Sequence, residues 1–217
     1  MQINHQAIRD VITVAKRQDQ RGVLNAYEGN ISVRDGDYVY CTPTGTNKAF
    51  LTEEMIAILD MDGNQVGGTL PASSEVKLHL HIYRNMDHVK GIVHAHAPYL
   101  TAYAVCNQPI RTKAYPEMIV VYGDIEIASY GRPGSDRIYQ DVVPLLEKSN
   151  VVLMQNHGPV AIGKDVYHAM NCMEAAEACA RILTLAKSVG EIHNLPDQEC
   201  EELMEIHMQR ICSERSI

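Results

Sequence analysis

Apolar side chains recur at a spacing typical of helices in several stretches of the chain. Gly22 follows the first of these stretches, and Gly190 follows a long one rich in alanine and glutamate. Glycine commonly ends a helix because it adopts backbone conformations that other residues avoid. Ser73 or Ser74 is placed to cap another helix. The pattern predicts helices over residues 3–22, from 73 or 74 to 84, 98–106, 136–148, 165–189 and 196–211.

Short runs rich in β-branched and aromatic residues lie between these helices. Two of them flank Asp35-Gly36-Asp37, and an aspartate–glycine pair at such a place favours a β-hairpin. Asp62-Gly63-Asn64 follows another apolar run and predicts a second hairpin. Strands are therefore expected at 31–33, 38–41, 56–59 and 151–154, and in the segment that begins at Gly91 and carries His94 and His96.

The alternation of strands and helices, with several strands joined by tight turns, defines the expected fold. Tight turns connect antiparallel neighbours, so the sheet cannot be wholly parallel. At 217 residues, without an internal repeat or a linker-like stretch, the chain has the size of one domain. We predict a single α/β domain over residues 1–217, with a central, mainly antiparallel sheet and helices on its faces.

Composition narrows the classes of function and partner. Hydrophobic residues make up 46% of the chain and charged residues 21%, which is typical of a globular protein in water. A formal net charge of −8 argues against nonspecific binding to nucleic acid. The sequence predicts neither a secretory signal nor an apolar stretch long enough to span a membrane, so no membrane partner is expected. Six scattered cysteines without a Cys-x-x-Cys pair indicate reduced thiols and a cytoplasmic location.

Three histidines stand out as candidate metal ligands. His94 and His96 are two residues apart in a predicted strand, so their side chains share one face. His157 follows a second apolar run and precedes a glycine and a proline, which places it at a strand end. Three imidazoles with an open position are typical of a catalytic metal site, with zinc as the default and manganese, cobalt or iron also accommodated. His79 and His81 lie on different faces of a predicted helix and are not expected to bind one ion together.

Three small-residue corners are candidates for binding a phosphate group. They are Gly29-Asn30, Thr42-Pro43-Thr44-Gly45 and Ser73-Ser74. Each alone is an ordinary turn or cap. Together they offer hydroxyl groups, a side-chain amide and backbone N–H groups, and the predicted helix start at the serine pair adds a partial positive charge.

Glu75 follows the serine pair directly, and two interpretations stay open. It is either an ordinary first-turn glutamate, stabilised by the helix dipole, or a carboxylate delivered to the metal. In the second interpretation it serves as a ligand or as a general base for a proton beside a carbonyl group.

These motifs together resemble the class II aldolase/adducin head family. The matching pieces occur in the family's order and spacing, span about residues 5–190, and are found at 29–34, 42–45, 73–75, 94–96 and 156–158. The resemblance implies a three-layer α/β/α fold and a zinc ion held by His94, His96, His157 and Glu75. It also implies that Glu75 transfers the proton in catalysis. It further implies a substrate phosphate held by Gly29, Asn30, Thr44, Gly45, Ser73 and Ser74.

The resemblance also implies a reaction and an assembly. The expected activity is reversible retro-aldol cleavage of a ketose 1-phosphate, such as L-fuculose 1-phosphate, to dihydroxyacetone phosphate and an aldehyde. The expected assembly is a cyclic homotetramer with active sites at subunit interfaces. Alternatives within the family are an L-ribulose-5-phosphate 4-epimerase, which typically has aspartate at the position of Glu75, and a 5-deoxyribulose-1-phosphate aldolase. An adducin-like module without catalysis is the alternative from another class, and the intact set of three histidines argues against it.

The aldehyde side of the site matches the family less closely. Family aldolases place a tyrosine, which acts as an acid, in the segment that corresponds to 115–118, where Tyr115 and Glu117 both qualify. The segment 130–134 departs from the aromatic–glycine pattern of the fuculose enzymes, and the tail 210–217 lacks their tyrosine. The resemblance therefore supports the metal and phosphate sides of the site and leaves the aldehyde unspecified.

Overall fold

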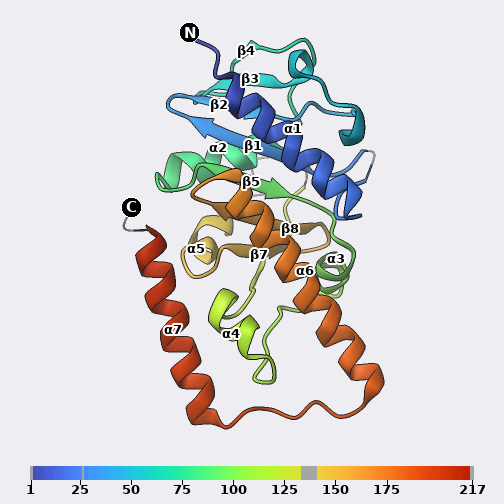
Figure 1. The fold of residues 1–217 in the computed structure, drawn as a ribbon, viewed down its shortest axis with the longest axis vertical. Coiled ribbons are helices and arrows are strands. Elements are labelled where there is room, and N and C mark those ends of the chain that lie inside the picture. Colours follow the sequence, from blue (N-terminus) through green and yellow to red (C-terminus); the bar gives the residue numbers. More distant parts are fainter. Residues whose placement is uncertain (1, 26, 133–140, 216–217) are drawn as a thin grey trace.

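One eight-stranded sheet forms the centre of the protein (Figure 1). The computed structural model describes residues 2–25, 27–132 and 141–215. Among these residues the strand order is β4-β3-β2-β1-β5-β8-β7-β6, and each neighbouring pair is antiparallel except β6 and β7. The strands are β1 (Asn30–Asp35), β2 (Tyr38–Cys41), β3 (Ala57–Asp60), β4 (Gln65–Gly67), β5 (Gly91–His94), β6 (Ile127–Ala128), β7 (Val151–Met154) and β8 (Gly158–Gly163). The predicted mainly antiparallel α/β fold is confirmed.

Helices cover both faces of this sheet, so the fold has three layers. The helices are α1 (His5–Gln20), α2 (Val76–Asn85), α3 (Pro98–Val105), α4 (Pro116–Tyr122), α5 (Val142–Leu146), α6 (Val166–Val189) and α7 (Asp197–Arg215), with short 3₁₀ turns at Lys48–Phe50 and Glu53–Met55. Alternate strand residues pack on opposite faces: Val93 joins the core under α1, α3 and α6, whereas Ile92 joins the core under α2 and α5.

The structure corrects several predicted boundaries. The helix expected from Ser73 or Ser74 begins at Val76, because the backbone N–H of Ser73 donates to Thr42 in a short β-bridge region instead of entering a helix. The helix expected over 136–148 is limited to α5 within the described residues, and 136–140 lie outside them. β5 ends at His94, so His96 lies beyond the strand. The sequence analysis did not identify α4, β6 and β8.

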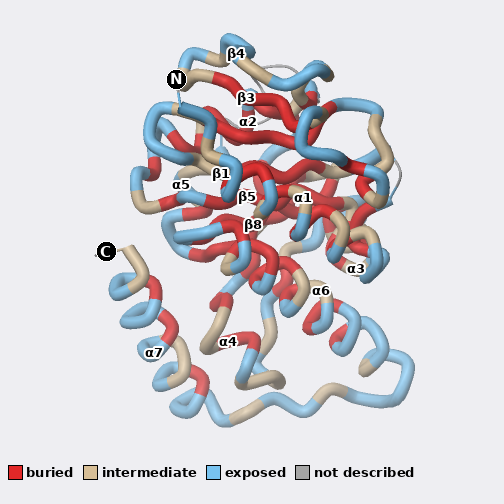
Figure 2. The backbone as a smooth tube through the Cα atoms, turned by 45° about the horizontal axis from the view of Figure 1, so that its top comes forward, coloured by how far each residue is buried: buried red, intermediate tan, exposed pale blue. Residues whose placement is uncertain are grey.

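The segment that follows α6, together with α7, extends beyond the sheet. Figure 2 shows the central strands as buried, whereas much of α7 and the segment 190–196 is exposed or half-buried. α7 returns along α4, where the buried ring of His207 places its two nitrogens 3.2 Å from the Val120 carbonyl oxygen and 3.0 Å from that of Lys148. Among the described residues, the helices include none with the length and apolar character needed to cross a bilayer.

Gly91 allows α6 to begin directly against β5. A Cβ atom at this position would lie 2.2 Å from the backbone nitrogen of Val166 and 2.3 Å from its Cα, so the helix would have to move. We predict that Gly91→Ala lowers the free energy of unfolding by about 2–3 kcal/mol, as overpacking of a rigid backbone does. Gly190→Ala is the matched control, because nothing lies within 4 Å of a Cβ there. Equal denaturation midpoints for the two variants would contradict this account.

Candidate metal centre

The side chains of three histidines converge at the end of β5, next to the turn between β7 and β8. β5 and β8 are antiparallel neighbours with His94 opposite Val160, so the turn that precedes β8 lies beside the end of β5. One ligand atom from each of His94, His96 and His157 lies within 4.8 Å of the others. The structure therefore brings together the three histidines that the sequence analysis singled out.

His94 is held as a neutral imidazole with one nitrogen free. Its Nδ1 donates to the Pro159 carbonyl oxygen at 2.9 Å, because a carbonyl oxygen can only accept. Burial lowers the pKa of His94 to about 3, so the ring carries a single proton, and this proton is on Nδ1. The buried Nε2 has no hydrogen-bond partner. Such an orphaned lone pair, with a carbonyl fixing the other nitrogen, is the usual arrangement of a metal-binding histidine.

His96 lies on the open side of the cluster. Its side chain is 23% exposed, against 0% for His94, and its Nδ1 lies 3.2 Å from a carboxylate oxygen of Glu28. Burial and the neighbouring His157 lower the pKa of His96. The segment after His96 is anchored by Glu177 on α6, whose carboxylate accepts from the first backbone N–H groups of α3, at residues 99 and 100, at 2.9 Å each.

His157 reaches the cluster from a tight turn. Asn156 adopts a φ of 57°, a left-handed conformation that asparagine tolerates better than most residues. On the other side of His157, Gly158 packs so closely that a Cβ would lie 2.5 Å from the Ala95 carbonyl oxygen. These two residues bring the β7–β8 turn against the end of β5, and His157 lies between them.

Glu75 completes the cluster from the start of α2. Its Oε1 lies 3.0 Å from His157 Nε2, its Oε2 lies 3.4 Å from His94 Nε2, and Oε2 accepts a 2.8 Å hydrogen bond from the Asn30 side-chain amide. Burial tends to raise the pKa of the Glu75 carboxyl, but His94, His157 and Asn30 together hold it well below its usual range. The ordinary first-turn interpretation is therefore insufficient, because the carboxylate faces the histidines.

The four side chains fit a divalent metal ion. Three imidazoles and one carboxylate are donors that zinc and its first-row neighbours accept. The orphaned His94 Nε2 is buried at the cluster, where an unpaired polar atom is costly unless a ligand satisfies it. The exposed edge at His96 leaves room for a further ligand to approach.

The three small-residue corners lie next to one another, near Glu75. The Thr42 backbone accepts from the N–H of Ser73 at 3.2 Å and donates to Ile31 at 3.0 Å, while Pro43 and Ala72 form an isolated β-bridge. These contacts join the second corner to the other two. Among the candidate phosphate ligands, Thr44, Gly45 and Ser74 are exposed. Gly29 is half-buried, and Asn30 and Ser73 are buried.

Gly29 permits the first corner to touch the metal cluster. Its φ is +74°, and a Cβ there would lie 2.8 Å from the His94 carbonyl oxygen and 2.2 Å from the Leu24 side chain. The Asn30 amide, expected at a phosphate, instead donates to Glu75. The sequence analysis missed the contacts of Glu28 and Pro159 with the histidines; Glu28, which precedes the Gly29 corner, could have been suspected from its place in the chain.

Tyr115 and Glu117 lie elsewhere, at the start of α4. The Tyr115 side chain is half-buried and hydrogen-bonded to the Cys179 thiol, whereas Glu117 is exposed. Within the described residues, neither side chain has a hydrogen bond or ion pair to the histidine cluster. The divergent segment 130–134 begins beside the β7–β8 turn, since the Tyr130 N–H donates to Gln155 at 3.1 Å. Residues 133 and 134 and the last two residues of the tail lie outside the described residues.

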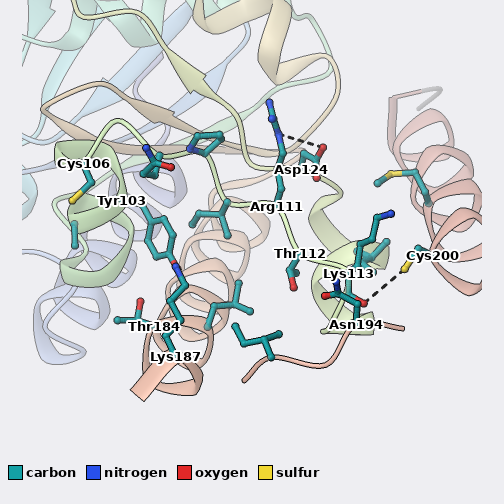
Figure 3. Close-up of a pocket in the computed structure, with 18 residues that line it drawn as sticks. Tyr103, Cys106, Arg111, Thr112, Lys113, Asp124, Thr184, Lys187, Asn194 and Cys200 are labelled. Atoms are coloured by element: carbon teal, nitrogen blue, oxygen red, sulfur yellow. Dashed lines mark hydrogen bonds and ion pairs between the residues drawn. The ribbon is translucent and has the colours of Figure 1, made fainter. Parts of the chain in front are cut away.

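A cavity lies away from the histidine cluster. It has a volume of about 980 Å³ and is bounded by α3, the segment 108–113, α6 and the residues that lead into α7 (Figure 3). Tyr103, Arg111 and Lys187 are among its lining side chains. Lys187 lies over the Tyr103 ring at 5.6 Å, and Arg111 is paired with Glu126, so these cations are already engaged. None of the predicted site residues lines this cavity.

Fold and site together define an α/β protein with a candidate metal centre at the ends of its antiparallel strands. The sequence model of the class II aldolase and adducin N-terminal domain matches residues 9–184. The chain belongs to this family.

Individual relatives agree on the family and differ in their activities. An L-fuculose phosphate aldolase of Methanococcus maripaludis strain C7 is 37% identical over 71% of this chain and 83% of its own length. A 3-oxo-tetronate 4-phosphate decarboxylase of Haemophilus influenzae is 33% identical over 85% of this chain and 89% of its own. A solved L-fuculose 1-phosphate aldolase superposes with a TM-score of 0.85 at 30% identity, over 94% and 96% of the two chains.

Zinc added to metal-free protein should bind at about one ion per chain and raise the melting temperature. At a free zinc concentration about 100 times Kd, the expected stabilisation is about 2.7 kcal/mol. His94→Ala and His157→Ala should each abolish this rise, while the exposed His5→Ala should keep it. Elemental analysis and calorimetry test the prediction. A zinc content well below one ion per chain in the unmutated protein would contradict it.

Proposed function

We propose that this protein is a divalent-metal-dependent sugar-phosphate aldolase that cleaves a ketose 1-phosphate, such as L-fuculose 1-phosphate, to dihydroxyacetone phosphate and an aldehyde. One observation carries the proposal: Glu75 and three histidines converge beside corners rich in hydroxyl and N–H groups. The family and the named aldolase relatives support it. None of the six cysteines, all of which lie in the described part of the chain, forms a disulfide, and this supports a reducing, cytoplasmic location.

His94, His96, His157 and Glu75 would hold the metal, with zinc as the default and manganese or cobalt as alternatives. When bound, a divalent ion supplies Lewis-acid polarisation of a carbonyl group and stabilises the negative charge that develops beside it. Glu28 and Pro159 orient His96 and His94 from behind.

Glu75 moves the proton. In the condensation direction its carboxylate removes a proton from the hydroxyl-bearing carbon next to the ketone, and the resulting carbanion attacks the aldehyde carbon. In cleavage the hydroxyl group beside the breaking bond loses its proton as the aldehyde forms, and Glu75, protonated in turn, delivers a proton to the carbon that is left. Against the opposing effect of burial, His94, His157 and Asn30 lower the pKa of Glu75, so its carboxyl is in the basic form that the condensation direction needs.

The acidic protein would hold an anionic substrate through local donors. Thr44, Gly45 and Ser74 are exposed at adjoining corners, and Ser73 lies beside them next to Glu75. The backbone N–H groups at the start of α2 add the partial positive charge of a helix N-terminus. We assign these residues, with Gly29, to the substrate phosphate. Asn30 belongs to this set only through the second hydrogen of its amide, because the first is donated to Glu75.

Tyr115 is our choice for the acid on the aldehyde side. Burial raises the pKa of Tyr115, so the phenol keeps its proton until an alkoxide forms nearby. Because Tyr115 does not contact the cluster of its own chain, this role fits a cyclic homotetramer in which α4 of one subunit faces the metal of another. Such an assembly would place the active sites at subunit interfaces.

A second candidate is decarboxylation of a 3-oxo acid phosphate. The observation that favours it is the 3-oxo-tetronate 4-phosphate decarboxylase relative, which matches 85% of this chain. Loss of carbon dioxide next to a ketone leaves the same kind of carbanion as aldol cleavage does, so the same four ligands would serve. Glu75 stands where the 4-epimerase of the family typically has aspartate, which favours an aldolase, and a 5-deoxyribulose-1-phosphate aldolase would use the same residues.

A substrate panel separates these functions. Release of dihydroxyacetone phosphate is followed across several ketose 1-phosphates, with ribulose 5-phosphate epimerisation and carbon dioxide release from 3-oxo-tetronate 4-phosphate measured in parallel. We expect the highest kcat/KM for a ketose 1-phosphate. Turnover of only the 3-oxo acid would replace the aldolase proposal with the decarboxylase.

Glu75→Gln keeps the size of the side chain and removes the base. We expect kcat for cleavage to fall by about 10²–10⁴-fold, the usual contribution of a general base. Metal content is measured on the same sample, so that loss of the ion is separated from loss of the base. The exposed Glu191→Gln serves as the control. Near-normal cleavage by Glu75→Gln would refute the proton-transfer role.

Tyr115→Phe removes the proposed acid and keeps the ring. We expect kcat for cleavage to fall by about 10²-fold with little change in metal content, since general acid catalysis contributes about this much. Glu117→Gln should stay within about twofold of the unmutated enzyme on the same scale. If the two variants exchange these outcomes, Glu117 is the acid.

A further inference from the structure

We propose that Ser32 and His79 are positioning residues for Glu75. A series of buried hydrogen bonds, which we call the polar ladder, links β1 to α2. Its first step is the hydrogen bond from Asn30 to Glu75, and its second step joins Ser32 to His79. The ladder fixes α2 along β1 and so holds the Glu75 carboxylate against the histidines. The inference rests on the proposed function only for the role given to Glu75.

The residues that interact recur at similar distances along β1 and along α2. Asn30 and Ser32 are two residues apart on one face of β1, which spans about 6.6 Å at the usual rise of a strand. Glu75, His79 and Tyr83 are successive fourth residues at the start of α2 and along it, which spans about 6 Å per step at the usual rise of a helix. Asn30 therefore meets Glu75, and Ser32 meets both His79 and Tyr83.

The second step is fully enclosed. Ser32, His79 and Tyr83 are each 0% exposed. The Ser32 hydroxyl lies 2.6 Å from His79 Nδ1 and 2.8 Å from the Tyr83 hydroxyl, which also donates to the Ser32 carbonyl oxygen at 3.1 Å. Burial lowers the pKa of His79 to about 4, so the ring is neutral. Its Nε2 has no partner, a cost that an apolar side chain at this position would avoid.

Hydrogen bonds are directional, so they fix the position of α2 along β1 more narrowly than apolar contacts do. Leu78 and Ile82 on α2 pack into the core beneath the helix, and such contacts change little when a helix slides slightly. Hydrogen bonds weaken steeply with distance and angle, so the polar steps favour one position of α2. Arg34 closes the far end of the ladder by donating to the Tyr83 carbonyl oxygen at 2.6 Å.

The ladder reaches the metal cluster through the sheet. Asn30 is directly opposite His94 in the pairing of β1 with β5. A helix fixed along β1 is therefore fixed relative to His94 as well, and Glu75 lies at the end of α2 nearest this pair. If the second step is lost, α2 keeps its apolar packing and Glu75 loses its defined position.

The test compares two substitutions at His79. His79→Asn keeps a polar atom near the place of Nδ1 and can bond to Ser32, whereas His79→Leu fills the space with an apolar side chain. In crystals of the metal-free proteins, we expect the Asn30–Glu75 hydrogen bond to be lost in His79→Leu and kept in His79→Asn. Zinc affinity, measured by competition with a chelator, should fall by about 10-fold in His79→Leu, as loss of outer support for a ligand does, and by less than about threefold in His79→Asn.

Two further variants keep the test decisive. Ile82→Val, on the same helix but off the ladder, is the control for general loss of packing and should leave zinc affinity unchanged. If His79→Leu fails to fold, Ser32→Ala removes the same step from the strand side. An Asn30–Glu75 bond and a zinc affinity both unchanged in the folded variant would overturn the proposal. The crystallographic distance is measured without metal or turnover. Normal cleavage by Glu75→Gln would therefore refute the proton-transfer role of Glu75 and still leave the ladder testable.

Discussion

The antiparallel pairing of β1 with β5 is the constraint on which the candidate site depends. It sets Asn30 opposite His94, and from there the Asn30 amide reaches Glu75 on α2. On the other edge of β5, the pairing with β8 brings the turn that carries His157 to the same end. A slip of one residue would turn His94 toward the opposite face, where α1 and α6 pack, because strand side chains alternate. The metal cluster therefore depends on strand register.

The proposed phosphate site illustrates how a protein with a net charge of −8 could present hydrogen-bond donors to an anion. The corners near Glu75 use hydroxyl groups, backbone N–H groups and the start of a helix, and these donors do not need a positive net charge. The candidate metal ligands and the proposed phosphate donors meet at Gly29, whose missing side chain lets one corner touch the His94 backbone. The two halves of the site are thus joined by a close backbone contact.

Much of the architecture could be predicted from local patterns, and the failures have identifiable causes. The hairpin around Gly36 and the helices on either side of the sheet follow directly from turn residues and apolar spacing. β8 was missed because Gly158 and Pro159 were interpreted as a corner, although they begin a strand. The helix after Ser73 begins later than predicted because this serine pairs with Thr42, 31 residues earlier in the chain. Local signals carry no information about such distant partners.

The candidate ligands themselves were readable in the chain. The pair His94 and His96, the lone His157 and the glutamate after two serines stand out by type and spacing. The convergence of these side chains could not be predicted from the sequence, because it requires β5 to lie between β1 and β8. The link from Asn30 to Glu75, and the enclosed pair of Ser32 with His79, likewise exist only once α2 lies along β1. Residue chemistry is local and can be read along the chain, whereas distances between elements are set by packing and sheet order.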